Sequence, residues 1–172
     1  MTNETPDTTA LLASLNDTTA EFLALVSAFS DTTINAIPYE DSWTAAQVAD
    51  HVTRSNTSMI RSLLLPGQAA NRPPDAGVPE LQKTFLDFTT RLQSPDFILP
   101  SEQVYDKEKL VTELQRSIDK VREVATTADP AEMLRLPIFG EVTKLELLHF
   151  IVYHTQRHIH QLKKIKTALD KK

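Results

Sequence analysis

The sequence predicts an all-α protein in which a single domain, residues 1–172, folds as a helical bundle. Glycine occurs only three times, which disfavours tight β-hairpins and excludes glycine-rich phosphate-binding loops. The ten prolines cluster and divide the chain into long blocks, and within these blocks apolar residues recur at helical spacing. We therefore expect every long element to be a helix, and no sheet of three or more strands.

The first two helices are predicted from apolar spacing and from one capping motif. Residues 8–34 carry apolar side chains three or four positions apart, as one face of a helix requires. A second helix should begin at Thr44, because Thr44 and Gln47 have the spacing of a capping box, in which a hydroxyl and an amide satisfy free backbone N–H groups. This helix should end near Leu65, before the Pro66–Gly67 turn.

Three more helices are predicted after a long loop. The third should cover about residues 80–92 and the fourth about residues 106–126, each with its apolar positions on one side. The last helix should begin at Thr143, again with a capping box to Glu146, and continue to about Leu169.

Composition is that of an ordinary globular protein, with 41% hydrophobic and 24% charged residues. No apolar run approaches the roughly 20 residues that span a bilayer, and the N-terminal stretch lacks the pattern of a signal peptide, so we expect a cytoplasmic location. The net charge of −5 makes nucleic acid an unexpected partner. Because the chain has no cysteine, any thiol chemistry needs a thiol brought in by another molecule.

Two of the five histidines share the core face of the last helix. With about 100° per residue, His158 and several core residues lie within about 80° of His154, whereas His149 and His160 lie beyond about 120°. His154 and His158 form an H-x-x-x-H pair, whose spacing brings two imidazoles within reach of one ion. The pair lacks the glutamate of zinc-protease motifs. Metal binding and a purely structural, hydrogen-bonded role both stay open for it.

His51 on the second helix faces inward beside apolar residues and small hydroxyls. A lone inward histidine is usually a hydrogen-bonded core residue. A row of hydroxyls next to it is more typical of a polar pocket within a bundle, where ligand sites are built from facing helices. The candidate substrate-binding residues are Gln47, Ser55, Ser58 and Gln161, although Gln161 could equally be a boundary residue.

Two stretches, SWTAAQVADHV (42–52) and FGEVTKLELLHFIVYHTQRHIHQL (139–162), resemble the DinB/YfiT-like superfamily. The first matches its W-[ST]-x-x-[EQ]-x-x-x-H signature, and the second matches its late helix, where H-x-x-x-H is followed closely by glutamine. The resemblance implies a four-helix bundle with an up-down-down-up arrangement and short additional helices. It also implies a divalent metal, often zinc or nickel, held by His51, His154 and His158, the three histidines that helix geometry selects.

The same resemblance implies an activity, because members of this superfamily include thiol S-transferases that use bacillithiol and mycothiol-dependent isomerases. Three neutral imidazoles would leave an ion with an open position, as in catalytic sites. The leading hypothesis is therefore a metal-dependent transferase of a low-molecular-weight thiol, such as bacillithiol, to electrophilic small molecules. Two alternatives are a metal-dependent hydrolase and a non-enzymatic metal- or ligand-binding stress protein.

A homodimer is also expected, since family dimers are common. The last helix carries a further apolar stripe, formed by Leu148, Val152 and Ile159. A two-fold partner would bury this stripe, and so would a second neighbouring helix within the same chain.

Overall fold

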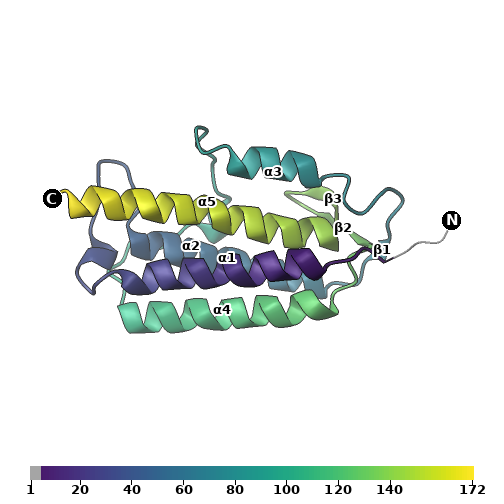
Figure 1. Cartoon of the computed structure of the whole chain (residues 1–172), viewed down its shortest axis with the longest axis horizontal. Helices are drawn as coiled ribbons and strands as arrows, with labels where there is room; N and C mark the ends of the chain where they lie inside the picture. Colours follow the sequence, from purple (N-terminus) through teal and green to yellow (C-terminus); the bar gives the residue numbers. More distant parts are fainter. Residues whose placement is uncertain (1–4) are drawn as a thin grey trace.

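The computed structural model describes residues 5–172 and contains four long helices that lie side by side (Figure 1). They are α1 (Thr9–Ala28), α2 (Ala45–Leu64), α4 (Lys107–Thr127) and α5 (Lys144–Asp170). In Figure 1, α1 and α5 run in one direction and α2 and α4 run in the other. The predicted bundle with an up-down-down-up arrangement is confirmed, and the first four residues of the predicted domain lie outside the described part.

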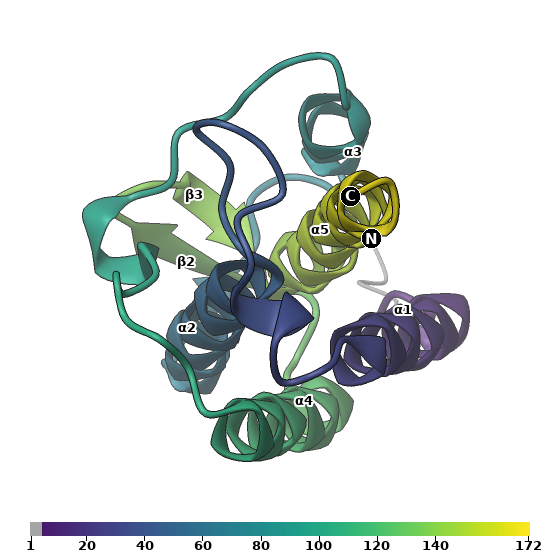
Figure 2. The ribbon, with the colours of Figure 1, turned by 90° about the vertical axis from the view of Figure 1, so that its left-hand side faces the viewer.

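Because α2 and α4 run in parallel, a long crossover must return the chain to the end at which α2 began. This crossover, residues 65–106, carries the helix α3 (Val78–Leu86) and the 3-10 turn η2 (Asp96–Ile98). A second 3-10 turn, η1 (Thr33–Asn35), lies between α1 and α2. Seen from one end of the bundle, α3 lies against α5 on the outside of the four helices (Figure 2).

Both predicted capping boxes form. The Thr44 hydroxyl accepts from the Gln47 N–H at 3.1 Å, and the Gln47 side-chain oxygen accepts from the Thr44 N–H at 3.0 Å. At the start of α5, Thr143 and Glu146 exchange the corresponding bonds at 3.1 and 2.9 Å. These bonds satisfy N–H groups that a helix start leaves without partners, so they fix where α2 and α5 begin.

Two helices are shorter than predicted. The helix α1 ends at Ala28, because Ser30 and Thr33 bond each other's backbone N–H groups at 2.9 and 3.0 Å and form a turn instead. The helix α3 ends at Leu86, because the Asp87 carboxylate accepts from the Thr89 N–H and from nearby hydroxyls. Short polar side chains compete with helical hydrogen bonds in this way.

A small antiparallel sheet is also present, so the expectation of no three-stranded sheet is wrong. Its strands are β1 (Gln68–Ala69), β2 (Glu132–Leu136) and β3 (Gly140–Thr143), in the order β1-β2-β3. Strands of two to five residues are too short to show a period of two. The reversal between β2 and β3 ends at Gly140, whose φ of 65° favours glycine. The sheet packs at one end of the bundle and leaves the all-α class unchanged.

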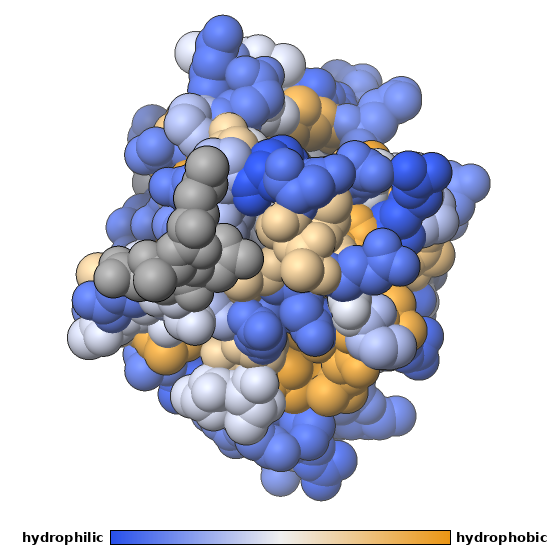
Figure 3. Space-filling view, turned by 90° about the vertical axis from the view of Figure 1, so that its right-hand side faces the viewer, coloured by the Kyte–Doolittle hydropathy of each residue, from blue (hydrophilic) through white to orange (hydrophobic). Residues whose placement is uncertain are grey.

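The apolar stripe on α5 is buried within the single chain. Leu148, Val152 and Ile159 are at most 6% exposed, because α5 packs against α1, α2 and α3. The stripe therefore offers no support for a dimer. Exposed apolar side chains occur elsewhere: at the end of the bundle that carries the sheet, where Figure 3 shows apolar patches among polar ones, Leu64 and Leu65 are exposed. Within residues 5–172, none of the helices combines the length and apolar character needed to cross a bilayer.

Candidate metal centre

Three buried histidines meet inside the bundle. His51 projects from α2, and His154 and His158 project from successive turns of α5. The Nε2 atom of His154 lies 3.1 Å from the Nε2 of His51 and 3.1 Å from the Nε2 of His158. One nitrogen from each residue lies within 4.8 Å of the other two, so the three rings could hold a single metal ion.

Hydrogen bonds to the far nitrogens indicate which tautomers are present. The Nδ1 of His51 lies 2.8 Å from the Ile98 carbonyl oxygen, and the Nδ1 of His158 lies 2.8 Å from the Gln161 side-chain oxygen. These oxygens accept, so each Nδ1 carries the proton. A neutral imidazole has one N–H, which leaves the Nε2 of both rings with a lone pair directed at His154.

The donor set therefore fits a cation. If His154 is protonated at Nε2, it has one N–H for two lone pairs, and if it is not, three lone pairs face one another. A divalent ion among the three nitrogens would replace this repulsion with attraction, and three imidazoles are a common ligand set of catalytic zinc. The bonds to Ile98 and Gln161 are of the kind that orients metal-binding histidines.

Burial keeps these imidazoles neutral. Burial lowers the pKa of His51 below its usual value, against the opposing effect of the Ile98 carbonyl. Burial and the neighbouring rings hold the pKa of His154 well below its usual range, and they lower the pKa of His158 to about 3. Neutral nitrogens at ordinary pH are the form that binds metal.

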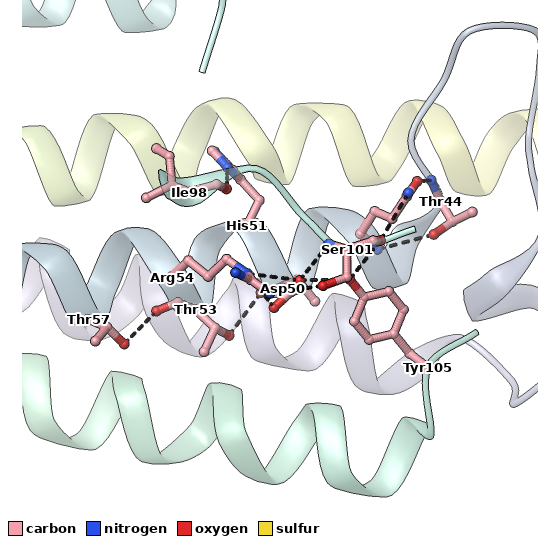
Figure 4. A network of polar contacts seen from close by, with 11 residues as sticks. Thr44, Asp50, His51, Thr53, Arg54, Thr57, Ile98, Ser101 and Tyr105 are labelled. Atoms are coloured by element: carbon pink, nitrogen blue, oxygen red, sulfur yellow. Dashed lines mark hydrogen bonds and ion pairs between the residues drawn. The ribbon is translucent and has the colours of Figure 1, made fainter. Parts of the chain in front are cut away.

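Asp50, next to His51 in the sequence, anchors the segment that supplies the Ile98 carbonyl (Figure 4). Its carboxylate accepts from the Tyr105 hydroxyl at 2.7 Å, from the Ser101 N–H at 3.2 Å and from the Arg54 Nε at 3.1 Å. The segment after η2 is thereby fixed against α2, and the acceptor for the Nδ1 of His51 is fixed with it.

Two cavities adjoin the histidines. The first, which we call the chamber, has a volume of about 280 Å³ and is bounded by α2, α3, the loop before η2, the β2–β3 turn and α5. The second, which we call the groove, is an open hollow of about 940 Å³ between the loop before α2, the loop after α3 and α5. All three histidines line the chamber, and His158 lines the groove as well.

Arg157 forms part of the wall of both cavities and holds the end of α3. Its guanidinium donates to the backbone carbonyls of Phe85 at 3.3 Å and Asp87 at 2.8 Å, and also to that of Thr90. The helix α3 has no fully buried residue of its own, so this contact helps to keep it against α5 over the chamber.

Comparison with known proteins agrees with the four-helix bundle fold. A family model described as the DinB superfamily matches residues 14–162, which is most of the sequence. The chain belongs to the DinB superfamily. Its similarity to the uncharacterized protein YuaE of Bacillus subtilis (strain 168) is 26% identity over 153 residues, covering 83% of this chain and 88% of YuaE.

Two solved structures of four-helix bundle proteins share the fold of this chain. YfiT from Bacillus subtilis, described as a probable metal-dependent hydrolase with an unusual four-helix bundle topology, superposes with a TM-score of 0.62 at 16% identity. That alignment covers 94% of this chain and 86% of YfiT. The four-helix bundle protein TT2238 superposes with a TM-score of 0.57 at 22% identity, covering 90% of this chain and 96% of TT2238. At these identities the likeness concerns the fold.

The four predicted substrate-binding residues of this DinB-superfamily chain do not all lie in the same cavity. Ser55 and Ser58 line the chamber, and Gln161 lines the groove while it accepts from His158. Gln47 lines neither of these two cavities, because its amide completes the capping box and donates to the Ser101 carbonyl at 3.4 Å.

The other two histidines lie outside the cluster formed by His51, His154 and His158. His149 is half-buried beside Tyr153, with ring centroids 5.7 Å apart. His160 is exposed and stacks on Phe88 at 4.2 Å, on the wall of the groove. His160 therefore stays outside the chamber but shares the groove with His158.

Sequence reasoning missed Asp50 and Arg157. Asp50 and Arg54 have the i, i+4 spacing of a helical ion pair, so this contact of Asp50 could have been predicted from the sequence. The other contacts of Asp50 come from Ser101 and Tyr105 in the crossover, and the acceptors of Arg157 are backbone carbonyls. No side-chain pattern in the sequence indicates such partners.

Proposed function

We propose that this chain is a metal-dependent enzyme that transfers a low-molecular-weight thiol to electrophilic small molecules, with His51, His154 and His158 as ligands of a divalent ion. The observation that carries the proposal is the convergence of three Nε2 atoms that have too few protons to hydrogen-bond one another. The chamber beside them gives a substrate direct access to the three rings.

A divalent ion held there would supply a positive charge that lowers the pKa of an approaching thiol or water molecule. Zinc and nickel both suit three imidazoles. Since three protein ligands leave a tetrahedral ion with an open position, the arrangement is that of a catalytic site and not that of a closed structural one.

The lining of the chamber favours thiol transfer over hydrolysis. In thiol transfer the thiol first loses its proton to solvent; its sulphur then forms a bond to the electrophilic carbon, and the leaving group departs with the bonding pair. A good leaving group needs no acid for this step. Hydrolysis commonly uses an acid or base side chain, and among the described residues that line the chamber there is no carboxylate.

A metal-dependent hydrolase is the second candidate, because the structural neighbour YfiT is described as a probable enzyme of that kind. In that case the ion would activate water in place of a thiol. A non-enzymatic metal- or ligand-binding protein is the third candidate. A turnover screen of electrophiles and esters, with and without added thiol, separates the three: thiol-dependent turnover supports the proposal, thiol-independent hydrolysis supports the second, and metal binding without turnover supports the third.

The ligand assignment is tested by the metal content of purified variants. His154→Ala should lose the metal, because two imidazoles on separate helices remain and the affinity should fall by more than about 100-fold. His160→Ala is the matched control on the same helix and should retain the wild-type metal content. Elemental analysis of both proteins, with circular dichroism to verify the helical fold, is the measurement. Loss of metal in His160→Ala and not in His154→Ala would place the site on the other face of α5.

A homodimer is part of the same proposal, and it rests on the family resemblance alone, since the α5 stripe is covered within the chain. Light scattering at micromolar concentration tests it, and a mass of one chain would reject it.

A further inference from the structure

We infer that the chamber binds a neutral, apolar ring compound that carries a hydrogen-bonding oxygen; this inference rests on the proposed function, in which that compound is the electrophile. Four features of the chamber favour this class of ligand: its walls, its polar strip, its charge and its size.

Most of the chamber wall is aromatic or aliphatic. Phe85 and Phe139 both meet Phe150 edge to face, with ring centroids 5.0 and 4.9 Å apart. Phe97 and Ile138 also line the chamber, although they are 60% and 55% exposed. Large apolar side chains that stay exposed around a cavity are typical of a ligand site, because a bound apolar molecule would shield them from water.

One strip of the wall is polar. Ser55 and Ser58 lie four and seven positions after His51 and share its face of α2, so their hydroxyls lead away from the three histidines along one side of the chamber. Among residues 5–172, neither hydroxyl forms a hydrogen bond with another protein group, whereas the next one along, Ser62, bonds the Ser58 carbonyl at 3.1 Å. The two hydroxyls are therefore free to bond an oxygen of a ligand.

The charges favour a neutral ligand. Arg157 carries the only permanent charge among the described residues that line the chamber, and its guanidinium is committed to carbonyls of Phe85, Asp87 and Thr90. Apart from the proposed ion, whose open position the thiolate would occupy, the chamber offers a charged ligand no free counter-charge in return for the hydration that it loses among apolar side chains. The groove, by contrast, has Asp41, Asp96, Arg91 and Lys164 on its wall.

The volume limits the size of the ligand. An apolar cavity of about 150 Å³ is known to hold benzene. The chamber, at about 280 Å³, has space for one ring with a substituent or for two small fused rings.

Isothermal titration calorimetry with three small probes of matched size tests the inference on the metal-loaded protein, in the presence of a saturating low-molecular-weight thiol such as bacillithiol. The thiol then occupies the open position of the ion, and a charged probe cannot bind there. Acetophenone has a ring and a carbonyl oxygen, ethylbenzene has the ring without the oxygen, and benzoate has the ring with a charge. Acetophenone should bind most tightly and benzoate most weakly. Ser55→Ala and Ser58→Ala should each weaken acetophenone by about two- to tenfold, which corresponds to one neutral hydrogen bond, and leave ethylbenzene unchanged. Ser62→Ala is the matched control and should change neither.

A second variant distinguishes loss of a specific hydrogen bond from misfolding of the protein. Ser55→Leu should fill the chamber and abolish binding of both acetophenone and ethylbenzene, while circular dichroism and metal content stay as in the wild type. If benzoate binds more tightly than acetophenone, or if Ser55→Leu leaves binding intact, the inference is overturned. If all three probes fail while the protein retains its metal, the inference fails and the proposed metal site stands. If the metal itself is absent, the proposed function fails first.

Discussion

At the residue scale, the proposed metal centre depends on which nitrogen of each imidazole carries the proton. The Ile98 carbonyl and the Gln161 side-chain oxygen hold the protons of His51 and His158 at Nδ1 and so direct both Nε2 lone pairs inward. One of these acceptors belongs to a backbone and cannot be removed by substitution. The other belongs to a side chain and can be.

Gln161→Ala should weaken metal binding by about 10- to 100-fold, the usual effect of removing a partner of a metal-binding histidine. The His158 ring would lose the acceptor that holds its proton at Nδ1, so its tautomer and orientation would no longer be fixed. Competition with a chelator measures the affinity. Gln156→Ala, on the same helix, is the control and should match the wild type, and Gln161→Glu should recover part of the affinity because it retains an acceptor oxygen. An unchanged affinity in Gln161→Ala would show that Gln161 does not orient His158.

The contact between Asp50 and Tyr105 should be detectable through the pKa of the Tyr105 hydroxyl. Burial, together with the hydrogen bond and the charge of Asp50, raises the pKa of Tyr105 to about 12. Asp50→Asn removes the charge, so the pKa of Tyr105 should fall toward its ordinary value of about 10. Ultraviolet absorbance of the tyrosinate follows this change, and Tyr105→Phe identifies the signal by deleting it. A tyrosine that still titrates near pH 12 in Asp50→Asn would mean that burial alone holds the phenol neutral.

At the element scale, the sequence predicted helix starts better than helix ends. The starts of α2 and α5 are set by side chains that read directly from the sequence, Thr44 with Gln47 and Thr143 with Glu146. The ends of α1 and α3 are set by local turns at Ser30 and Asp87, whose hydrogen bonds compete with those of a longer helix. The spacing of apolar residues does not reveal the small difference in free energy that decides between the two. The short strands escaped prediction for a similar reason, because their pairing is decided by the packing at the end of the bundle.

Glu146 joins the start of α5 to the crossover. Its buried carboxylate accepts from Arg72 at 2.6 and 2.8 Å, from the Gly77 N–H at 2.6 Å and from the Thr143 N–H. Burial alone would raise the pKa of Glu146, but these donors outweigh burial and hold the pKa below its usual value. The carboxylate is thus charged at neutral pH, and the guanidinium of Arg72 balances its negative charge.

Arg72→Ala should lower the free energy of unfolding by about 1–3 kcal/mol, the usual effect of removing a donor to a buried charged group. We expect a value in the lower part of that range, because the Arg72 side chain is 30% exposed and water screens the ion pair. Urea unfolding measures the change. Arg116→Ala, at an exposed position of α4, should stay within about 0.5 kcal/mol of the wild type. A loss in Arg72→Ala no larger than in this control would show that the contact adds nothing to stability.

At the scale of the whole molecule, the site is assembled from parts that the sequence reveals unequally. The histidines could be predicted, since their spacing on α2 and α5 gives their faces directly. The course of the crossover could not, because outside the predicted helix at about residues 80–92 it carries no periodic pattern that says which surface it covers. Yet this crossover supplies the carbonyl of Ile98, the carbonyls that hold Arg157 and part of the chamber wall. The candidate metal ligands were thus visible in the sequence, while the cavity beside them depended on tertiary packing.

A metal ion held by one residue of α2 and two of α5 should stabilise the whole bundle, and the gain should depend on pH. With free metal at 100 times its dissociation constant, linkage adds about 2.7 kcal/mol, or about 5–10 °C in the melting temperature of a chain of this size. Calorimetry with and without zinc at pH 8 measures this gain, and His158→Ala should show none.

The sign of the pH effect follows from the lowered pKa values. Burial lowers the pKa of all three histidines, that of His158 to about 3, so below about pH 6.5 the unfolded chain binds more protons than the folded one. The metal-free protein should therefore lose stability as the pH falls from about 6.5 toward 3. Protons also compete with the ion for the same nitrogens, so the zinc-dependent gain should shrink over the acidic part of this window. A gain at pH 5 as large as at pH 8 would mean that the ion is held by groups other than these imidazoles.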